Sequence, residues 1–255
     1  MCRSSQAHAE PHATLRVPGG MPGGVEVQAM TDHDPTGHID DLLTAAYALD
    51  GPDANRVLYA RWADTYESGF IAPSKYVYRE EVVRVFADYG RDQVGQTEAI
   101  ADIGCGTGLA GAALRRLRAV NIDGIDISPQ MLQQAASKQH HGTSVYRDLI
   151  EADLTHPLVI DDDTYAGAVS VGTLTHGHVG PAVVAEAVRI VRSGGRAAIG
   201  INTAHFATAD FGHTLEQLVL ASTINNLELI EAPISDGAEP RNADDIALIA
   251  TFEVT

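Results

Sequence analysis

Apolar residues in the first third of the chain recur three or four positions apart, which is the spacing of one helix face. Three stretches have this spacing: residues 39–46, 58–66 and 74–90. Ser74 is a candidate N-cap for the third stretch, and Gly90 is its candidate stop. The pattern therefore predicts a helical region before residue 93.

Beyond residue 95, short apolar runs alternate with segments of helical spacing. The expected strands are residues 99–103, 120–125, 146–152, 165–171 and 195–201. The expected helices cover residues 109–117, a segment capped by Ser128 with Pro129 at its first position, and residues 181–192. Repeated strand–helix units are typical of a parallel sheet with helices on both faces.

The tail of the chain has a different pattern. A helix around residues 215–221 precedes two apolar runs, 224–230 and 246–254, with only a polar loop between them. Two strands without an intervening helix predict an antiparallel hairpin at one edge of the sheet. We expect an α/β fold: a doubly wound, Rossmann-like, seven-stranded sheet, mostly parallel with an antiparallel C-terminal strand, and an N-terminal helical cap.

Residues 1–37 lack an apolar period and are rich in proline and glycine, as in the run 18–24. They predict a disordered leader, followed by a helical cap over 38–92 and a sheet domain over 93–255. Met30 begins a more typical opening, so an alternative is that residues 1–29 stem from an over-long gene prediction.

Composition and charge argue against some classes of binding partner. The 255 residues carry 17 Lys and Arg against 34 Asp and Glu, a formal charge of −17, which would repel a phosphate backbone. No uncharged apolar run approaches the roughly 20 residues of a membrane span. Cys2 and Cys105 lie far apart in unlike contexts. We expect a cytoplasmic protein without disulfides that binds neither nucleic acid nor membrane; a homodimer is an open option.

The segment Asp102–Gly108, Asp-Ile-Gly-Cys-Gly-Thr-Gly, stands where a strand should end and a helix begin. Glycines there let the backbone turn sharply and approach a ligand closely. Read from Gly106, the loop fits the dinucleotide pattern Gly-x-Gly-x-x-Gly, and Asp126 follows 20 residues later. The alternative reading, Asp-x-Gly-x-Gly-x-Gly, includes Asp102. A carboxylate beside a pyrophosphate would be repelled, whereas beside a sulfonium or ammonium it is favourable.

At these residues the sequence resembles the class I S-adenosylmethionine-dependent methyltransferases. The resemblance continues through residues 124–128, 152–154, 169–179 and 191–195, and covers roughly residues 55–255. Residues 59–67 are similar to the opening motif of the Williams-Beuren-region methyltransferase-like subgroup. The chain departs from that motif at Ala60 and Glu67, where the subgroup usually has Asp.

The resemblance implies S-adenosylmethionine as cofactor, with S-adenosylhomocysteine as product. Gly104 and Gly106 would lie beside its methionine portion and Asp102 near its amino group. Asp126 would accept hydrogen bonds from the ribose hydroxyls. The implied adenine contacts are Asp153, Leu154 and Met131, and the cofactor set also includes Ile127 and Val171.

Each of these positions has a structural alternative. Asp126 could be a helix cap, Asp153 part of a solvated acidic loop and Met131 a core residue. Cys105 is best explained as a small packing residue, because no second cysteine or evident base accompanies it.

The methyl acceptor should lie beyond the carboxyl ends of the strands, beside the glycine loop. His176 and His178 follow the fourth strand, and either imidazole could act as a base. They could also share a metal, but the loop offers no further ligand, so no metal site is expected. Tyr66 is the candidate for approaching the methyl group. The remaining acceptor-site candidates are Tyr59, Trp62, Phe70, His205 and Phe206, of which Trp62 also fits a core position.

The sequence thus predicts an enzyme that transfers a methyl group from S-adenosylmethionine to a small organic acceptor, at O, N or C, in bacterial-type secondary or specialised metabolism. One alternative is a protein that binds this cofactor, or a non-methylating catalyst, on the same fold. A second is a nicotinamide-dependent oxidoreductase. The acceptor itself is not named by the sequence.

Overall fold

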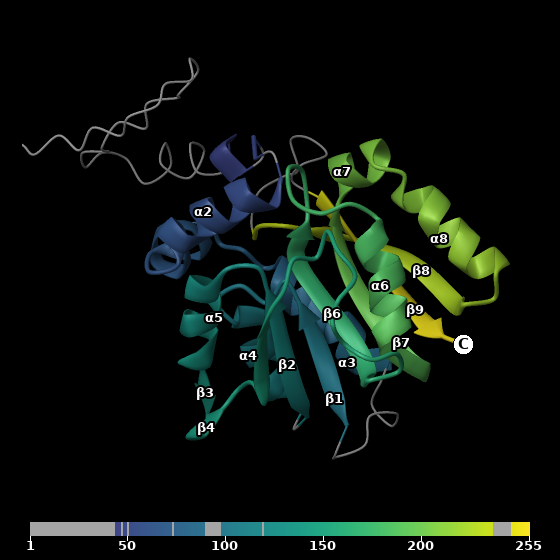
Figure 1. Ribbon diagram of the computed structural model, residues 1–255, viewed down its shortest axis with the longest axis horizontal. Helices are drawn as coiled ribbons and strands as arrows, with labels where there is room; N and C mark the ends of the chain where they lie inside the picture. The colour runs from purple at the N-terminus through teal and green to yellow at the C-terminus, as the bar shows by residue number, and fades with distance from the viewer. Residues whose placement is uncertain are drawn as a thin grey trace, which may run out of the picture. The chain divides into compact units, whose positions relative to one another are not determined.

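The alternating segments build one seven-stranded sheet in the order β5-β2-β1-β6-β7-β9-β8 (Figure 1). The strands are β1 Ala99–Ile103, β2 Asn121–Asp126, β5 Asp148–Glu151, β6 Tyr165–Leu174, β7 Val191–Asn202, β8 Ile224–Pro233 and β9 Ile246–Val254. Strand β9 runs antiparallel to β7 and to β8, and the other neighbours are parallel. This confirms the predicted mostly parallel sheet with an antiparallel C-terminal strand.

The computed structural model describes residues 44–46, 48–49, 51–72, 74–89, 98–118, 120–236 and 246–255. The predicted leader over 1–37, and most of the helix predicted over 39–46, lie outside these ranges. Within the described part of the chain, no helix is both long enough and apolar enough to span a membrane.

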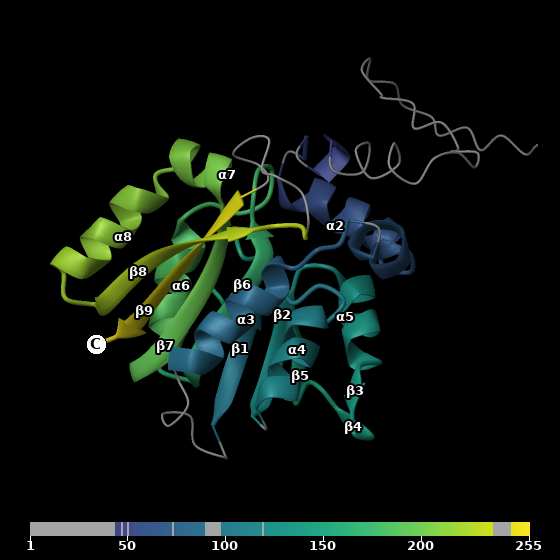
Figure 2. The same cartoon turned by 180° about the vertical axis from the view of Figure 1, so that it is seen from behind.

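Helices cover both faces of the sheet. Their bounds are α2 Pro52–Trp62, α3 Tyr78–Tyr89, α4 Leu109–Leu117, α5 Pro129–Ala136, α6 Ala182–Ile190, α7 Thr203–Thr208 and α8 Phe211–Leu220, with a π-helix, η1, at Glu67–Ile71. Helices α6 and α8 share one buried cluster with the sheet, and α3, α4 and α5 share the other. Figures 1 and 2 show these two sides.

Side-chain alternation explains why the sheet needs helices on both faces. In β1, Ala99 and Ala101 join the cluster with α6, whereas Ile100 between them joins the cluster with α3. Successive residues of a strand point to opposite faces. Every residue of β1 is buried, so both faces require a cover.

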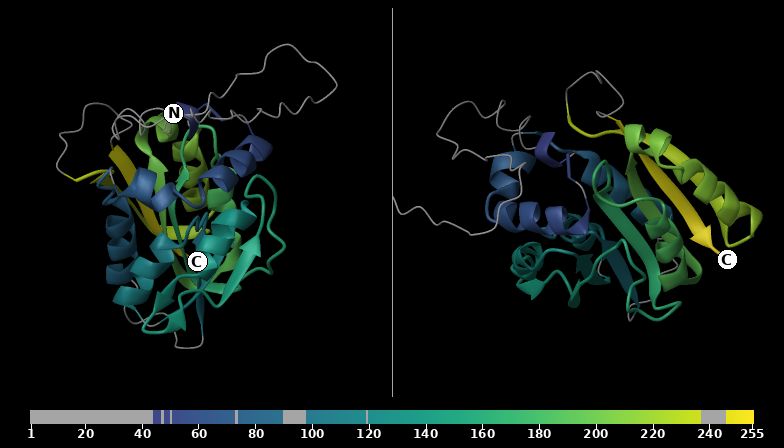
Figure 3. Two further views of the ribbon diagram at one scale, coloured as in Figure 1. Left: turned by 90° about the vertical axis from the view of Figure 1, so that its left-hand side faces the viewer. Right: turned by 45° about the horizontal axis from the view of Figure 1, so that its top comes forward.

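Helix α2 and η1 lie beyond the carboxyl ends of the parallel strands (Figure 3). Trp62 and Ala63 pack with Met131 of α5 in a small buried cluster. Two polar contacts join the same elements: Gln134 Nε2 donates to Asp64 Oδ1 at 2.8 Å, and Lys138 Nζ to Glu67 Oε1 at 2.6 Å. Helix α3 packs on the sheet face instead. The helical region predicted over 38–92 therefore divides into two parts: a cap formed by α2 and η1, and helix α3, which covers a face of the sheet.

Helix α3 begins at Tyr78, not at the predicted N-cap Ser74. The backbone amides of Val77 and Tyr78 donate to Ile234 O, and Tyr76 forms a β-bridge with Ser235. Pairing with the end of β8 holds the chain extended here and delays the helix.

The boundary predicted after α6 was also wrong. Helix α6 ends at Ile190, and β7 starts at once with Val191, which pairs with Tyr165 before the register shifts. The short helix α7 and a small hairpin, β3 Gln139–His140 with β4 Thr143–Ser144, were not expected.

Candidate functional site

The glycine loop between β1 and α4 is fixed to the end of β2. The amides of Gly104 and Cys105 donate to Ile125 O at 2.8 and 3.0 Å. Gly104 has φ +70°, and a Cβ there would meet Thr173 Oγ1 at 2.0 Å, so only glycine fits. Gly106 has φ +53°, but a Cβ there would meet nothing within 4 Å. The backbone at Gly106 therefore borders open space.

Asp126 completes this junction. Its Oδ2 accepts from the amide of Gly106 and its Oδ1 from the amide of Ser128, both at 2.9 Å. Burial raises the pKa of Asp126, and these two hydrogen bonds oppose the rise. Each carboxylate oxygen keeps a lone pair for a further donor. The side chain thus supports the loop and still offers acceptor positions.

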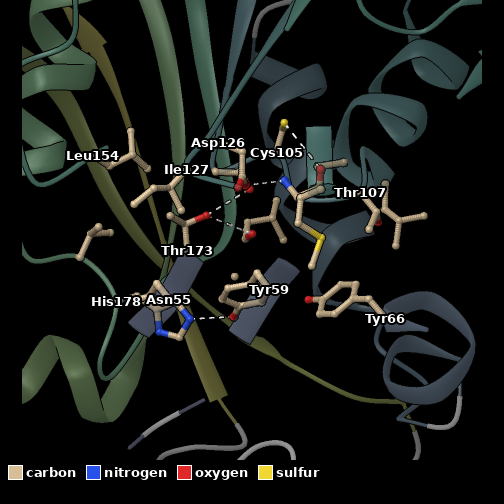
Figure 4. Close-up of a pocket in the computed structure, with 18 of the residues that line it drawn as sticks. Asn55, Tyr59, Tyr66, Cys105, Thr107, Asp126, Ile127, Leu154, Thr173 and His178 are labelled. Atoms are coloured by element: carbon tan, nitrogen blue, oxygen red, sulfur yellow. Dashed lines mark hydrogen bonds between the residues drawn. The ribbon is translucent and has the colours of Figure 1, made fainter. Parts of the chain in front are cut away.

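A cavity of about 970 Å³, part of it open to solvent, lies against this loop and beneath α2. Figure 4 shows Asp126 and Thr173 on one side of this space, with His178, Tyr59 and Tyr66 on the other. The predicted site residues that line it are Tyr59, Tyr66, Gly104, Gly106, Asp126, Ile127, Met131, Asp153, Leu154, Val171 and His178. Residues from the glycine loop after β1, from β2, from β6 and from the cap therefore meet here.

Six of the predicted site residues do not line the cavity: Trp62, Phe70, Asp102, His176, His205 and Phe206. Trp62 stacks on Phe70 at 6.3 Å between ring centroids and belongs to the cap cluster. Phe206 stacks on Phe211, and His205 also contacts the Phe211 ring. These side chains pack the protein around the cavity and do not form its wall.

Asp102 departs furthest from its expected place. It is fully buried, and its Oδ2 accepts from the Tyr146 hydroxyl at 2.7 Å, in the layer between the sheet and α4. Burial raises the pKa of Asp102 to about 6, partly opposed by the Tyr146 hydrogen bond. The side chain stands perpendicular to the sheet, as strand geometry requires, and so misses the cavity.

His178 is held in one tautomer. Its Nδ1 lies 2.8 Å from His176 O, and a carbonyl only accepts, so Nδ1 carries the hydrogen. The neutral ring then has Nε2 as acceptor, and the Tyr59 hydroxyl donates to it at 2.7 Å. Burial lowers the pKa of His178, so the ring is neutral at neutral pH. Tyr59 and His178 form a polar pair on the cavity wall.

Sequence reasoning missed several residues of the wall. Asn55 is 6% exposed; its Nδ2 donates to Gly51 O at 3.0 Å and to Gly177 O at 2.9 Å. Among the described residues, Asn55 Oδ1, Thr107 Oγ1 and Arg79 Nη1 are buried without a hydrogen-bond partner. All three side chains line the cavity. The spacing of Asn55 and Tyr59, four apart on one helix face, was the available signal.

Asp153 and Cys105 also line the cavity, and their surroundings determine their protonation. Asp153 Oδ1 accepts from the amide and hydroxyl of Thr155 at 2.9 and 2.7 Å. Partial burial raises the pKa of Asp153, but these hydrogen bonds outweigh it and lower the pKa overall. Burial raises the pKa of the Cys105 thiol well above its usual value, which disfavours a nucleophilic thiolate. No group of three possible metal ligands gathers among the residues that the structure describes.

Comparisons with known proteins agree with this geometry. Residues 100–195 match a family model described as a methyltransferase domain. Over 107 residues, 42% of this chain and 32% of the relative, the sequence is 28% identical to methyltransferase phqN of Penicillium fellutanum. The chain thus spans about a third of the length of this curated relative.

Solved structures share the fold at low sequence identity. A chain of the Haloferax volcanii complex between the Trm112 methyltransferase activator and a methyltransferase has TM-score 0.54 and 17% identity, over 77% of this chain and 97% of that one. A structure described as an S-adenosylmethionine-dependent methyltransferase from Methanococcus maripaludis has TM-score 0.51 and 16% identity, over 77% and 93%. The chain is therefore similar in sequence to a methyltransferase domain over residues 100–195, and it shares its fold with these methyltransferase structures.

Proposed function

We propose that the protein transfers a methyl group from S-adenosylmethionine to a small organic acceptor. One observation carries the proposal: a single cavity joins the glycine loop and Asp126 to the Tyr59–His178 pair. The first group suits a cofactor, and the second suits an acceptor that has a proton to lose. The predicted homodimer, the cytoplasmic location and membership of the Williams-Beuren-region subgroup stay predictions.

The cavity wall near the loop fits the cofactor. A Cβ at Gly106 would enter the open space, so the missing side chain leaves room for a ligand. Thr107 Oγ1 is a buried hydroxyl oxygen without a partner among the described residues. Asp126 offers acceptors for ribose hydroxyls, and Ile127, Met131 and Leu154 supply apolar surface. Arg79, with its unpaired Nη1, suits an anionic group such as a carboxylate.

The opposite wall suits the acceptor. Tyr59, Tyr66 and Tyr76 line it together with Ile71 and Val179. Enclosure in the cavity raises the pKa of Tyr66 to about 12, so its hydroxyl stays protonated at neutral pH. Aromatic and aliphatic walls with a few polar groups are typical of sites for small molecules.

When bound, S-adenosylmethionine supplies an activated methyl group. The protein's part is to align the acceptor, to exclude water and to accept a proton where the acceptor has one. His178 is neutral and has its Nε2 turned toward Tyr59 in the cavity, so it is the proposed proton acceptor. The backbone carbonyl of His176 accepts from His178 Nδ1 and so keeps the tautomer of His178 fixed.

Isothermal titration calorimetry tests the cofactor directly. We expect S-adenosylmethionine to bind the wild-type chain and NAD not to bind. Asp126→Ala should weaken binding by about 1–3 kcal/mol, because it removes acceptors for ligand hydroxyls. Binding of NAD alone would make the protein a nicotinamide-dependent one and end the proposal.

Asp161→Ala is the matched control, since it removes an exposed carboxylate that does not line the cavity. Its affinity for S-adenosylmethionine should equal that of the wild type. Asp126 also supports Gly106 and Ser128, so thermal unfolding of the variant is measured alongside. Unchanged affinity in a folded Asp126→Ala variant would remove Asp126 from the cofactor site.

A further inference from the structure

Tyr59, His178 and the carbonyl of His176 form a continuous chain of hydrogen bonds that starts at the cavity. The hydroxyl of Tyr59 donates to His178 Nε2 at 2.7 Å, and His178 Nδ1 donates to His176 O at 2.8 Å. Figure 4 shows the Tyr59–His178 contact bordering the open space. The carbonyl can accept only, so a proton can be stored on the imidazole but cannot pass beyond it.

Asn55 holds this chain in place. It lies four residues before Tyr59 on α2, and its Nδ2 donates to Gly177 O, next to His178. Because its Nδ2 faces the carbonyls of Gly51 and Gly177, the amide orientation is fixed and Oδ1 is left for another donor. Asn55 is 6% exposed and lines the cavity. A donor on a bound acceptor would satisfy this buried oxygen.

On the basis of the proposed methyl transfer, we propose that Tyr59 and His178 form a proton relay that deprotonates a phenolic hydroxyl of the acceptor. The acceptor hydroxyl gives its proton to the Tyr59 oxygen while the Tyr59 proton moves to His178 Nε2. The acceptor oxygen forms a bond to the methyl carbon, and the electron pair of the broken carbon–sulfur bond stays on sulfur. The positive charge that sulfur loses is carried at the end by the His178 imidazolium, so charge and atoms balance.

The chemistry of the relay selects the acceptor class. Tyr59 is itself a phenol, so a proton moves between its oxygen and another phenol at small intrinsic cost, whereas an aliphatic alcohol is a far weaker acid. A neutral amine can attack a methyl group before it loses its proton, so it does not need a relay. The tyrosine-lined wall is also suited to an aromatic ring.

The groups that face His178 keep it ready to accept a proton. They are Tyr59 from α2, His205 from α7 and His176 in its own loop. Burial, with a smaller contribution from His205, lowers the pKa of His178; the hydrogen bond to His176 O opposes this. Its neutral form therefore predominates at neutral pH, and the relay should fail only in acid.

The relay can be tested with para-nitrophenol, a phenol that absorbs visible light only when ionised. The full chain, labelled with ¹⁵N-histidine, is titrated with it at pH 7, with and without S-adenosylhomocysteine. We expect bound para-nitrophenol to be ionised and the ring nitrogens of His178 to shift to imidazolium values. The unliganded protein should show the Nδ1–H tautomer.

Two variants locate the proton. In His178→Gln, bound para-nitrophenol should stay neutral. In Tyr59→Phe, His178 should no longer be protonated on binding, and its pKa should rise, since it loses a hydrogen bond that favours the neutral ring. Tyr165→Phe is the matched control, because this tyrosine does not line the cavity and its hydroxyl donates to Asp123; it should leave the ionisation as in the wild type.

Three outcomes would each overturn the relay. The wild type could fail to bind para-nitrophenol, it could bind without protonation of His178, or His178 could take up a proton in Tyr59→Phe. Calorimetry with S-adenosylhomocysteine on the same samples separates the two proposals. If S-adenosylhomocysteine binds and the relay fails, the proposed methyl transfer remains, but with a different class of acceptor. If the relay works and S-adenosylhomocysteine does not bind, only the proposed methyl transfer is contradicted.

Discussion

Asp102 carries an ionisable group into the interior of the protein, where its Oδ2 accepts from the Tyr146 hydroxyl and its Oδ1 is buried without a partner among the described residues. A carboxylate pays a desolvation penalty there, which explains the raised pKa of about 6. Its folded pKa exceeds the ordinary value of 3.8. The stabilising contribution of protonated Asp102 is therefore present below about pH 4 and lost as the pH rises through about 6.

Asp102→Asn should remove this pH dependence. Between pH 4 and pH 7, the free energy of unfolding of the wild type should fall by about 3 kcal/mol relative to that of the variant, the equivalent of two pKa units. Urea unfolding of both proteins at half-unit steps of pH measures the difference. A difference that stays constant across this range would show that Asp102 titrates normally.

Individual residues also show how far sequence reasoning reaches. Gly104, Gly106 and Asp126, which the sequence predicts as cofactor contacts, all line the cavity, because they lie at or just after strand ends and these ends share one edge of a parallel sheet. Asp102, one residue before its strand ends, points into the helix layer instead. Asn55 was not identified, because its place depends on how α2 lies across the sheet edge, which local spacing does not specify.

Helix α4 shows the same limit at the scale of an element. Its range was predicted well, but the need for glycine at position 111 arises from a residue outside the helix. A Cβ there would meet Tyr146 Oη at 2.3 Å. The Tyr146 hydroxyl is in turn bonded to Asp102. Gly111 therefore permits the close approach of Tyr146, and the dinucleotide motif that the sequence matched through Gly111 has a packing explanation.

Gly111→Ala should lower the free energy of unfolding by about 1–3 kcal/mol, the usual cost of overpacking, despite the higher helix propensity of alanine. Gly212→Ala in α8 is the matched control, because a Cβ there meets only Phe206 ring atoms at 3.7 Å. That variant should be unchanged or more stable, by up to about 1 kcal/mol. Chemical denaturation measures both. Equal effects would mean that the Tyr146 contact does not restrict position 111.

For the whole molecule, the cavity joins parts of the chain that are far apart in sequence. Asn55 comes from the cap, Gly106 and Asp126 from the first two strand ends, and His178 from the loop after β6. The succession of strands and helices along the chain was predictable from the alternating pattern. The position of α2 was not predictable, since it depends on a small cluster around Met131 and on polar contacts, exposed or partly buried, that contribute little individually.

A ligand that bridges these parts should stabilise them together. S-adenosylhomocysteine at 100 times its dissociation constant should raise the free energy of unfolding by about 2.7 kcal/mol, and NAD should have no effect. Urea unfolding with each ligand measures this. Equal stabilisation by both ligands would indicate nonspecific binding, and none by S-adenosylhomocysteine would contradict a site formed by the folded chain.

Met131 has a second consequence, because it belongs both to the cavity wall and to the cluster that contains Trp62. Trp62 is the chain's single tryptophan. Its indole lies one side chain away from any molecule in the cavity, shielded from water and stacked on Phe70. The protein thus contains its own optical reporter: the emission of one indole, without an added dye, follows the arrival and departure of a ligand in real time.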